Sequence, residues 1–145
     1  MHKELKIAIA KTPQQMTAIF EIRREVFVKE QSVSEDEEYD DYEDTSIHLA
    51  AYFEEQMVGT CRYRTTNKGV KLERFAVLKR HRKDGVGAAL LQFALNQLDD
   101  LSVVYLHAQV QVVDFYGRYG FSKVGEQFEE AGIQHFKMVY SPNDC

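Results

Sequence analysis

Between Leu72 and Leu91 the chain reads LERFAVLKRHRKDGVGAALL, an apolar strand followed by a basic turn and a glycine-broken helix start. The strand covers Leu72–Leu78 and the helix Val86–Leu98, and four cationic side chains occupy residues 79–83. A helix N-terminus reached through such a turn presents free N–H groups and the positive end of the helix dipole. Glycine lets a ligand approach the backbone closely. The segment therefore predicts a phosphate-binding turn.

The spacing of the two glycines narrows the kind of phosphate site. It matches neither the G-x-x-x-x-G-K-[ST] of a P-loop nor the G-x-G-x-x-G of a dinucleotide-binding turn. What remains is an R-x-x-G-x-G string at residues 82–87, placed between a strand and a helix. This arrangement resembles the pyrophosphate loop of the GNAT acyltransferase superfamily, which binds the diphosphate of acetyl-CoA.

Further segments extend this resemblance over nearly the whole chain, in the expected order. The string FYGRYGF at 115–121 resembles the F-Y-x-x-x-G-F segment of the superfamily. The strings RREVFVKEQ at 23–31 and GIQHFKM at 132–138 resemble the ElaA/YjcF-like branch, as do His48 and the acidic loop before it. The resemblance implies one N-acetyltransferase domain over residues 1–145.

Length and composition agree with one domain of this class. The chain has 145 residues, 44% of them hydrophobic, with nine Phe and eight Tyr to build a core. No apolar run approaches the roughly 18 residues of a membrane span, and the apolar stretch at the N-terminus is too short for a signal peptide. Two cysteines are too few for a disulfide framework. We expect a soluble cytoplasmic protein without membrane association.

The net charge of −5 is unevenly distributed, because eight carboxylates lie within residues 35–44. With cations concentrated in one turn, there is no broad basic surface for nucleic acid. The acidic window either borders the acceptor site and attracts a cationic amine, or is a solvated, mobile run of charge. No His, Cys and Asp spacing indicates a metal site.

Hydrophobic periodicity predicts the elements between these motifs. Thr12 and Gln15 form a capping box before a helix that continues to near Gln31, and residues 32–45 are expected to be a polar loop. The other expected strands and short helix are Leu5–Ile9, Ile47–Phe53, Met57–Thr65, Val70–Leu78, Val103–Leu106, Val112–Tyr119 (helix), Phe121–Phe128 and Ile133–Tyr140. Together with the resemblance, this order predicts an α/β fold with a mixed, mostly antiparallel sheet of about seven strands and helices on both faces.

The resemblance also implies where acetyl-CoA, the co-substrate, binds. The fourth and fifth strands part in this superfamily, and the pantetheine arm pairs there with the fourth strand, here the backbone of Phe75, Ala76 and Val77. Gln109 stands where many members carry an asparagine and is assigned to the cofactor. The loop residues assigned to the cofactor are Arg82, Lys83, Asp84, Gly85, Val86, Gly87 and Ala88.

Two residues are candidates for catalysis. Tyr116 matches the tyrosine that often protonates the departing thiolate, and the alternative is that it packs with the neighbouring aromatic residues. Glu73 matches a glutamate that some members use as a base or to position water, and the alternative is an exposed strand residue. Strand alternation predicts that Glu73, Phe75 and Val77 share one face.

The acceptor site is assigned to Glu30, Gln31, His48 and His135, with satisfied core histidines as the alternative for the last two. The predicted reaction is direct attack of a small-molecule or peptide amine on the thioester in a ternary complex. A non-catalytic CoA-binding module and a different phosphate-ligand enzyme, such as a nucleotide binder, are the alternatives. The terminal strand is a candidate for a homodimer contact, and the oligomeric state stays open.

Overall fold

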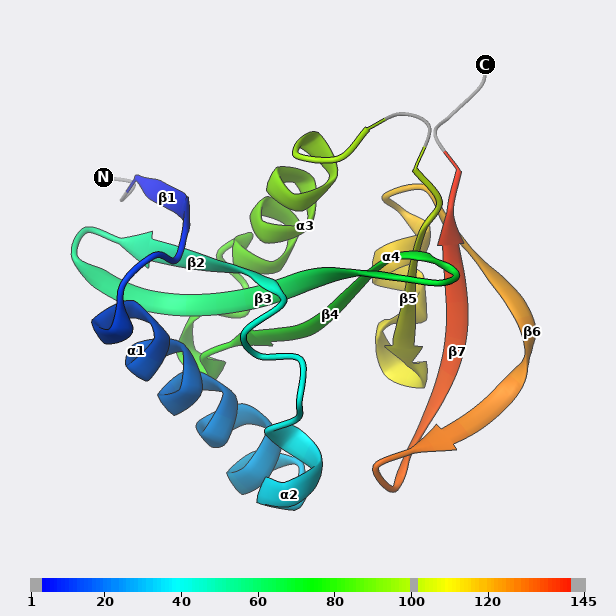
Figure 1. Ribbon diagram of the computed structural model, residues 1–145, viewed down its shortest axis with the longest axis horizontal. Helices are drawn as coiled ribbons and strands as arrows, with labels where there is room; N and C mark the ends of the chain where they lie inside the picture. The colour runs from blue at the N-terminus through cyan, green and yellow to red at the C-terminus, as the bar shows by residue number, and fades with distance from the viewer. Residues whose placement is uncertain (1–3, 100–101, 142–145) are drawn as a thin grey trace.

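The computed structural model describes residues 4–99 and 102–141, which form one sheet with helices packed on it (Figure 1). The elements are β1 (Leu5–Ile9), α1 (Pro13–Arg23), the π-helix η1 (Arg24–Glu30), α2 (Glu35–Glu38), β2 (Ile47–Phe53), β3 (Gln56–Thr66), β4 (Gly69–Val77), the 3-10 helix η2 (Lys79–His81), α3 (Val86–Asn96), β5 (Val104–Gln109), the 3-10 helix η3 (Val110–Val112), α4 (Val113–Gly117), β6 (Phe121–Glu130) and β7 (Ile133–Tyr140). The predicted order is confirmed, with short α2 lying inside the segment expected to be a loop.

The sheet has seven strands in the order β1-β2-β3-β4-β5-β7-β6. Every neighbouring pair is antiparallel except β4 and β5, which run parallel and are joined by the crossover through α3. The predicted α/β architecture with a mostly antiparallel sheet is therefore confirmed.

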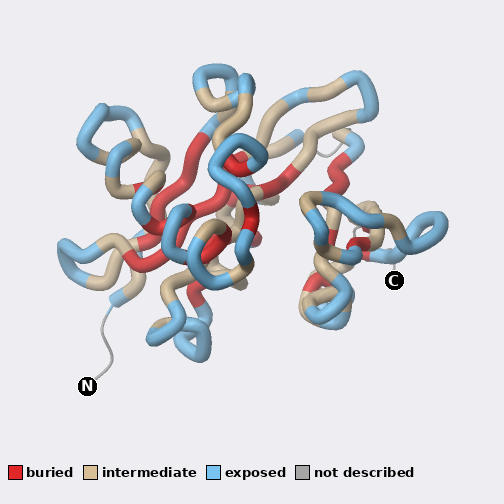
Figure 2. Tube along the Cα trace, turned by 90° about the horizontal axis from the view of Figure 1, so that it is seen from below, coloured by how far each residue is buried: buried red, intermediate tan, exposed pale blue. Residues whose placement is uncertain are grey.

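Helices cover both faces of the sheet, as predicted. Leu90 and Leu91 of α3 and Tyr116 of α4 are buried in the core on one face. On the other face, Ile22 of α1 and Val26 of η1 belong to a smaller core cluster. Figure 2 shows the buried stretches as central segments of the strands and helices, with exposed turns at their ends.

The first helix begins as its sequence predicts. The backbone N–H of Gln15 donates to Oγ1 of Thr12 at 3.1 Å, and the N–H of Thr12 donates to Oε1 of Gln15 at 3.0 Å. This reciprocal capping satisfies donors that have no intrahelical partner. The helix then widens into the π-helical turn η1, which carries Glu30 to the edge of the sheet opening described below.

A bulge in β4 breaks the alternation predicted for this strand. Glu73 pairs with Arg62 on β3, whereas Ala76 pairs with Thr60, so β4 contains one extra residue. Arg74 takes up the extra length with φ of 59°. The prediction that Glu73, Phe75 and Val77 share a face is therefore wrong. Phe75 and Val77 pack against the α3 core, while the Glu73 side chain contacts arginines on the opposite face.

Strands β4 and β5 pair over a short length and then part. Their register joins Val70–Leu72 with Val104–Leu106 and ends there. Figure 1 shows the two strands running apart beyond this point, β4 toward α1 and β5 toward the lower end of β7. The parting leaves Phe75–Val77 without a strand neighbour on the β5 side, among the residues that the structure describes. We call this place the β4–β5 opening.

Candidate active site

The turn after β4 leads to a helix N-terminus with free backbone donors. Gly85 caps α3 in the left-handed conformation, with φ of 80°, and no side chain caps the helix. The first bonded amide is that of Ala89, which donates to the carbonyl of Gly85 at 3.1 Å. Within residues 4–99 and 102–141, the N–H groups of Val86, Gly87 and Ala88 have no hydrogen-bond acceptor. An anion at this end of α3 would find three donors and the positive end of the helix dipole.

The surface at this turn is open. A Cβ atom built on Gly85 would meet no atom within 4 Å, and one built on Gly87 would meet only the edge of the Phe115 ring, at 3.6 Å. The four cationic side chains of the turn are exposed, and they are Lys79, Arg80, Arg82 and Lys83. A hollow of about 500 Å³ lies between this turn and η1. The residues present therefore fit the diphosphate of a CoA-type ligand.

Arg82 connects the turn to both β4 and η1. Its Nε donates to the carbonyl oxygen of Val77 at 2.9 Å, and its guanidinium contacts Oε1 of Glu30 at 2.7 Å. Glu30, predicted for the acceptor site, thus lies against the predicted cofactor loop. Asp84, also predicted for the cofactor, lies 3.1 Å from Nδ1 of His81 and so closes the turn on itself.

Gln31 and Gln109 face each other across the β4–β5 opening. The side-chain amide of Gln109 donates to Oε1 of Gln31 at 2.9 Å. This contact brings a residue predicted for the acceptor together with one predicted for the cofactor, from positions 78 residues apart in the sequence. The two predicted sites therefore meet at one place.

Tyr116 lies on the α3 face of the sheet, beside the opening. Its ring is 5.7 Å from that of Phe75 and 5.1 Å from that of Phe115, in edge-to-face arrangements. Burial raises the pKa of Tyr116, so the phenol keeps its proton at neutral pH. Among the described residues its hydroxyl has no hydrogen-bond partner. Tyr116 thus packs with aromatic residues, as one interpretation predicts, and its catalytic role stays a prediction.

Glu73 is surrounded by cations. Its carboxylate lies 2.7 Å from the guanidinium of Arg62, 2.6 Å from that of Arg64 and 3.3 Å from Nζ of Lys71. Burial alone would raise the pKa of Glu73, but these neighbours, with Arg62 first, lower it overall. A carboxylate held by three cations is a poor proton acceptor, which argues against Glu73 as a base, and its catalytic role stays a prediction.

The acidic segment is anchored by two buried arginines that the sequence did not mark as special. Arg23 contacts Glu38 at 2.7 Å and Glu43 at 2.8 Å, and Arg62 contacts Asp40 at 2.6 Å and Glu43 at 2.8 Å. Both arginines are 1% exposed. Three of the eight carboxylates therefore hold the segment in place, and the other five are exposed. One available signal was that Arg23 falls on the apolar face of its helix, beside Ile19 and Ile22.

The two predicted acceptor histidines lie at different distances from the opening along the sheet. His48, on β2, contacts the carbonyl oxygen of Glu43 through Nε2 at 2.8 Å, and burial lowers its pKa, so it is a neutral part of the acidic segment's anchor. His135, on β7, pairs with Gln109 on β5 and stacks on Phe128. Only His135 is thus next to a residue of the opening.

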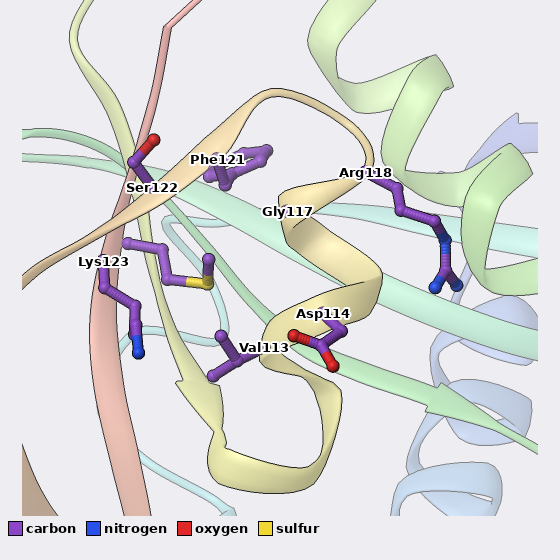
Figure 3. A pocket seen from close by; sticks show the side chains of 8 residues that line it. Val113, Asp114, Gly117, Arg118, Phe121, Ser122 and Lys123 are labelled. Carbon is purple, nitrogen blue, oxygen red and sulfur yellow. The ribbon is translucent and has the colours of Figure 1, made fainter.

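Other features of the surface do not belong to this site. An open hollow of about 530 Å³ between α4, β6 and β7 is lined by residues such as Asp114 and Lys123, and Tyr116 does not line it (Figure 3). Among the described residues, no group of three or more His, Cys, Asp or Glu side chains is arranged to hold a metal ion. No helix in the described part of the chain is long and apolar enough to cross a membrane.

Comparisons with known proteins agree with this geometry. The family model of the acetyltransferase (GNAT) domain matches residues 7–142. The chain is 41% identical over 138 residues to an uncharacterized N-acetyltransferase, YjcF, of Bacillus subtilis, covering 93% of this chain and 99% of that protein. The crystal structure of Escherichia coli ElaA superposes with a TM-score of 0.84 at 25% identity, covering 97% of this chain and all of that one.

An acyl-CoA N-acyltransferase from Pseudomonas aeruginosa also has a similar structure, with a TM-score of 0.83, 28% identity, and coverage of 95% of this chain and 99% of that chain. The match to the family model extends over nearly the whole chain, from within β1 to beyond the end of β7. The chain therefore belongs to the GNAT acetyltransferase family, in the branch that includes YjcF and ElaA.

Proposed function

We propose that this protein is an N-acetyltransferase that moves an acetyl group from acetyl-CoA to an amine by direct attack in a ternary complex. The observation that carries the proposal is the β4–β5 opening, which lies directly beside a helix N-terminus with three unpaired amides. A thioester ligand with a diphosphate needs both an anion site and a slot that an extended arm can enter. Acetyl-CoA supplies the activated acyl group.

The backbone supplies most of the proposed cofactor site. The N–H groups of Val86, Gly87 and Ala88 hold the diphosphate, with charge from Arg82 and Lys83 nearby. Phe75, Ala76 and Val77 present the unpaired side of β4 to the pantetheine arm. Because Arg82 contacts Glu30 at 2.7 Å, its contact with phosphate requires exchange of this ion pair.

Tyr116 is the proposed proton donor for the departing thiolate. The contact of its ring with that of Phe75, a residue of the proposed cofactor strand, supports this role. A phenol that stays protonated in a buried site can give its proton to a thiolate as the C–S bond breaks. The acceptor amine then approaches from the opposite face, past the Gln31–Gln109 pair.

The first test is thermal unfolding of the full chain with and without acetyl-CoA, and with ATP as the control ligand. A ligand that binds only the folded state raises the free energy of unfolding by about 2.7 kcal/mol when its concentration is a hundredfold above its Kd. The midpoint of thermal unfolding therefore rises with ligand concentration. No rise at saturating acetyl-CoA, or an equal rise with ATP, would remove the basis of the proposal.

The second test separates an enzyme from a non-catalytic CoA-binding module. Release of free thiol is measured with an amine panel for the wild type, Tyr116→Phe and Tyr119→Phe. Tyr119 packs against the same Phe115 ring and serves as the matched control. We expect Tyr116→Phe to keep acetyl-CoA binding and lose about a hundredfold in rate. Binding without thiol release in the wild type would favour the module.

A further inference from the structure

A histidine and a glutamate form a pair at the β4–β5 opening, on the face away from Tyr116. His107 is the first residue of β5 beyond the last pair with β4, Leu72–Leu106. Leu106 and Ala108 point into the α3 core, so His107 between them points to the opposite face. There its Nδ1 lies 3.2 Å from Oε2 of Glu130, at the end of β6.

The position of this pair is set by packing. The His107 ring stands edge-on to Phe128, with centroids 5.0 Å apart, and lies 6.0 Å from the ring of Tyr105. A register shift in β6 between Val124 and Phe128 brings the end of the strand over β5 and β7. Among the described residues the only hydrogen bond of the ring is that of Nδ1, and the side chain is 23% exposed. The contact of Nδ1 with Glu130 therefore orients the ring, and it leaves Nε2 available as a proton acceptor.

Other titratable groups at the opening are already engaged. Glu73 binds three cations, and Glu30 contacts Arg82 at 2.7 Å. His135 has its Nδ1 2.7 Å from the carbonyl oxygen of Ile133. Among these groups His107 best combines a free acceptor nitrogen, a partner carboxylate on its other nitrogen and a place at the point where the strands part.

We propose that His107 is the general base of the transfer reaction and that Glu130 positions it, an inference that rests on the proposed function. Nε2 of His107 takes one proton from the acceptor ammonium, which frees the nitrogen lone pair. The nitrogen forms a bond to the acyl carbon, and the C–S bond breaks. Tyr116 gives its proton to the thiolate, and the adduct nitrogen loses its second proton to solvent. Tyr116 then takes a proton back from solvent, and the imidazolium releases its own proton there. Base and acid thus act from opposite faces of one sheet.

The surrounding charges favour this assignment. The hydrogen bond from His107 lowers the pKa of Glu130 to about 2, against the effect of burial, so the carboxylate is ionised at neutral pH and can stabilise an imidazolium. The neighbouring charged or titratable groups on this sheet face are Lys71 and Glu73 of β4, Lys137 and His135 of β7, and the Glu73-bound Arg62 and Arg64 of β3. A histidine changes its charge near neutral pH, which suits a base that must accept and release a proton in each cycle.

The test measures kcat and KM for thiol release from acetyl-CoA between about pH 6 and about pH 9, the range that covers histidine titration. The acceptors are n-butylamine, spermidine, glycinamide and a lysine-containing peptide. We expect His107→Gln to lower kcat/KM by about a hundredfold at pH 7. It should also remove the acid limb, which is the fall in kcat/KM at low pH. We expect added imidazole to restore part of the rate of His107→Ala.

Glu130→Gln tests the positioning role, with Glu129→Gln as the matched control on the same strand. Loss of the charged hydrogen-bond partner should lower kcat by about tenfold, leave KM unchanged and move the acid limb to lower pH. Glu129 is exposed and pairs with Gln134, so its change should leave the profile as in the wild type.

Thermal shifts with acetyl-CoA, measured on each variant, separate the outcomes. If His107→Gln binds acetyl-CoA and keeps the wild-type rate and acid limb, the base assignment is overturned while the transferase proposal stands. If the wild type binds acetyl-CoA but releases no thiol with any acceptor, the transferase proposal fails and the base assignment fails with it.

Discussion

Gly85 and Gly132 have nearly the same backbone conformation but different surroundings. Their φ angles are 80° and 76°, and a Cβ built on either would meet no atom within 4 Å. Gly85 precedes the free amides of α3, whereas Gly132 lies in the turn between β6 and β7. An alanine therefore strains both positions equally, but only at Gly85 would it stand where the diphosphate is proposed to lie.

We predict that Gly85→Ala and Gly132→Ala each lower the free energy of unfolding by about 1–2 kcal/mol, because alanine is disfavoured in the left-handed region. Only Gly85→Ala should also reduce the rise in unfolding midpoint that acetyl-CoA produces. Thermal unfolding with and without the ligand measures both effects. An undiminished ligand response in Gly85→Ala would place the diphosphate elsewhere.

At the scale of elements, buried charge rather than apolar packing holds the acidic segment to the sheet. Arg62 of β3 bonds Asp40 and Glu43 of this segment and Glu73 of β4, and Arg23 bonds Glu38 and Glu43 from α1. Taking such charges out of water is unfavourable unless every charge finds partners. The network meets this condition and joins α1, the α2 segment, β3 and β4.

Removing one member of this network should leave its partners uncompensated. We predict that Arg62→Met lowers the free energy of unfolding by about 3–5 kcal/mol, because Glu73 and Asp40 lose a buried counter-charge. Arg80→Met, at an exposed position, should change it by no more than about 0.5 kcal/mol. Urea unfolding at neutral pH measures both, and similar values for the two variants would show that the network adds little.

At the scale of the whole molecule, several carboxylates tie stability to pH. Burial raises the pKa of Asp40, but hydrogen bonds led by that from Arg62 lower it to about 2 overall. The pKa of Glu130 is also lowered to about 2, and those of Glu43 and Glu73 are lowered. Glu38 acts in the opposite sense, because burial raises its pKa. The lowered values mean that the unfolded chain binds protons more readily than the folded one.

The protein should therefore be fully stable above about pH 4, where unfolded carboxyls ionise, and lose stability as pH falls toward about 2. Asp40→Asn should make this dependence shallower, since it removes one of the shifted groups. Asp41→Asn, at an exposed neighbouring position, is the control and should keep the wild-type slope. Urea unfolding midpoints measured between about pH 2 and about pH 4 test this prediction. Equal slopes of midpoint against pH in the two variants would contradict the role given to Asp40.

The elements that the sequence predicted well are those whose signals are local. The capping box at Thr12 depends on residues three apart, and β2 occupies the run Ile47–Phe53 that the sequence predicted. The helix after the basic turn begins at Val86, as the sequence predicted. These features depend on short-range geometry, so they can be predicted from a short segment of the sequence.

The bulge at Arg74 and the buried state of Arg62 had no such local signal. Nothing in the residues around Arg74 requires the left-handed conformation, which arises because β4 must pair with β3 while its side chains meet two different cores. Arg62 is buried because carboxylates about 20 residues earlier fold back over it. The surroundings of Glu73 were missed for the same reason, since two of its three cationic partners, Arg62 and Arg64, come from β3.

The sequence by itself therefore determined the order of elements, the basic turn before α3 and the family resemblance, all of which rest on neighbouring residues. Only the tertiary structure decided which side chains meet at the β4–β5 opening. Gln31 contacts Gln109 and His107 contacts Glu130 across separations of 78 and 23 residues. Such contacts depend on sheet order and register, which are set by the packing of the whole chain rather than by any one segment.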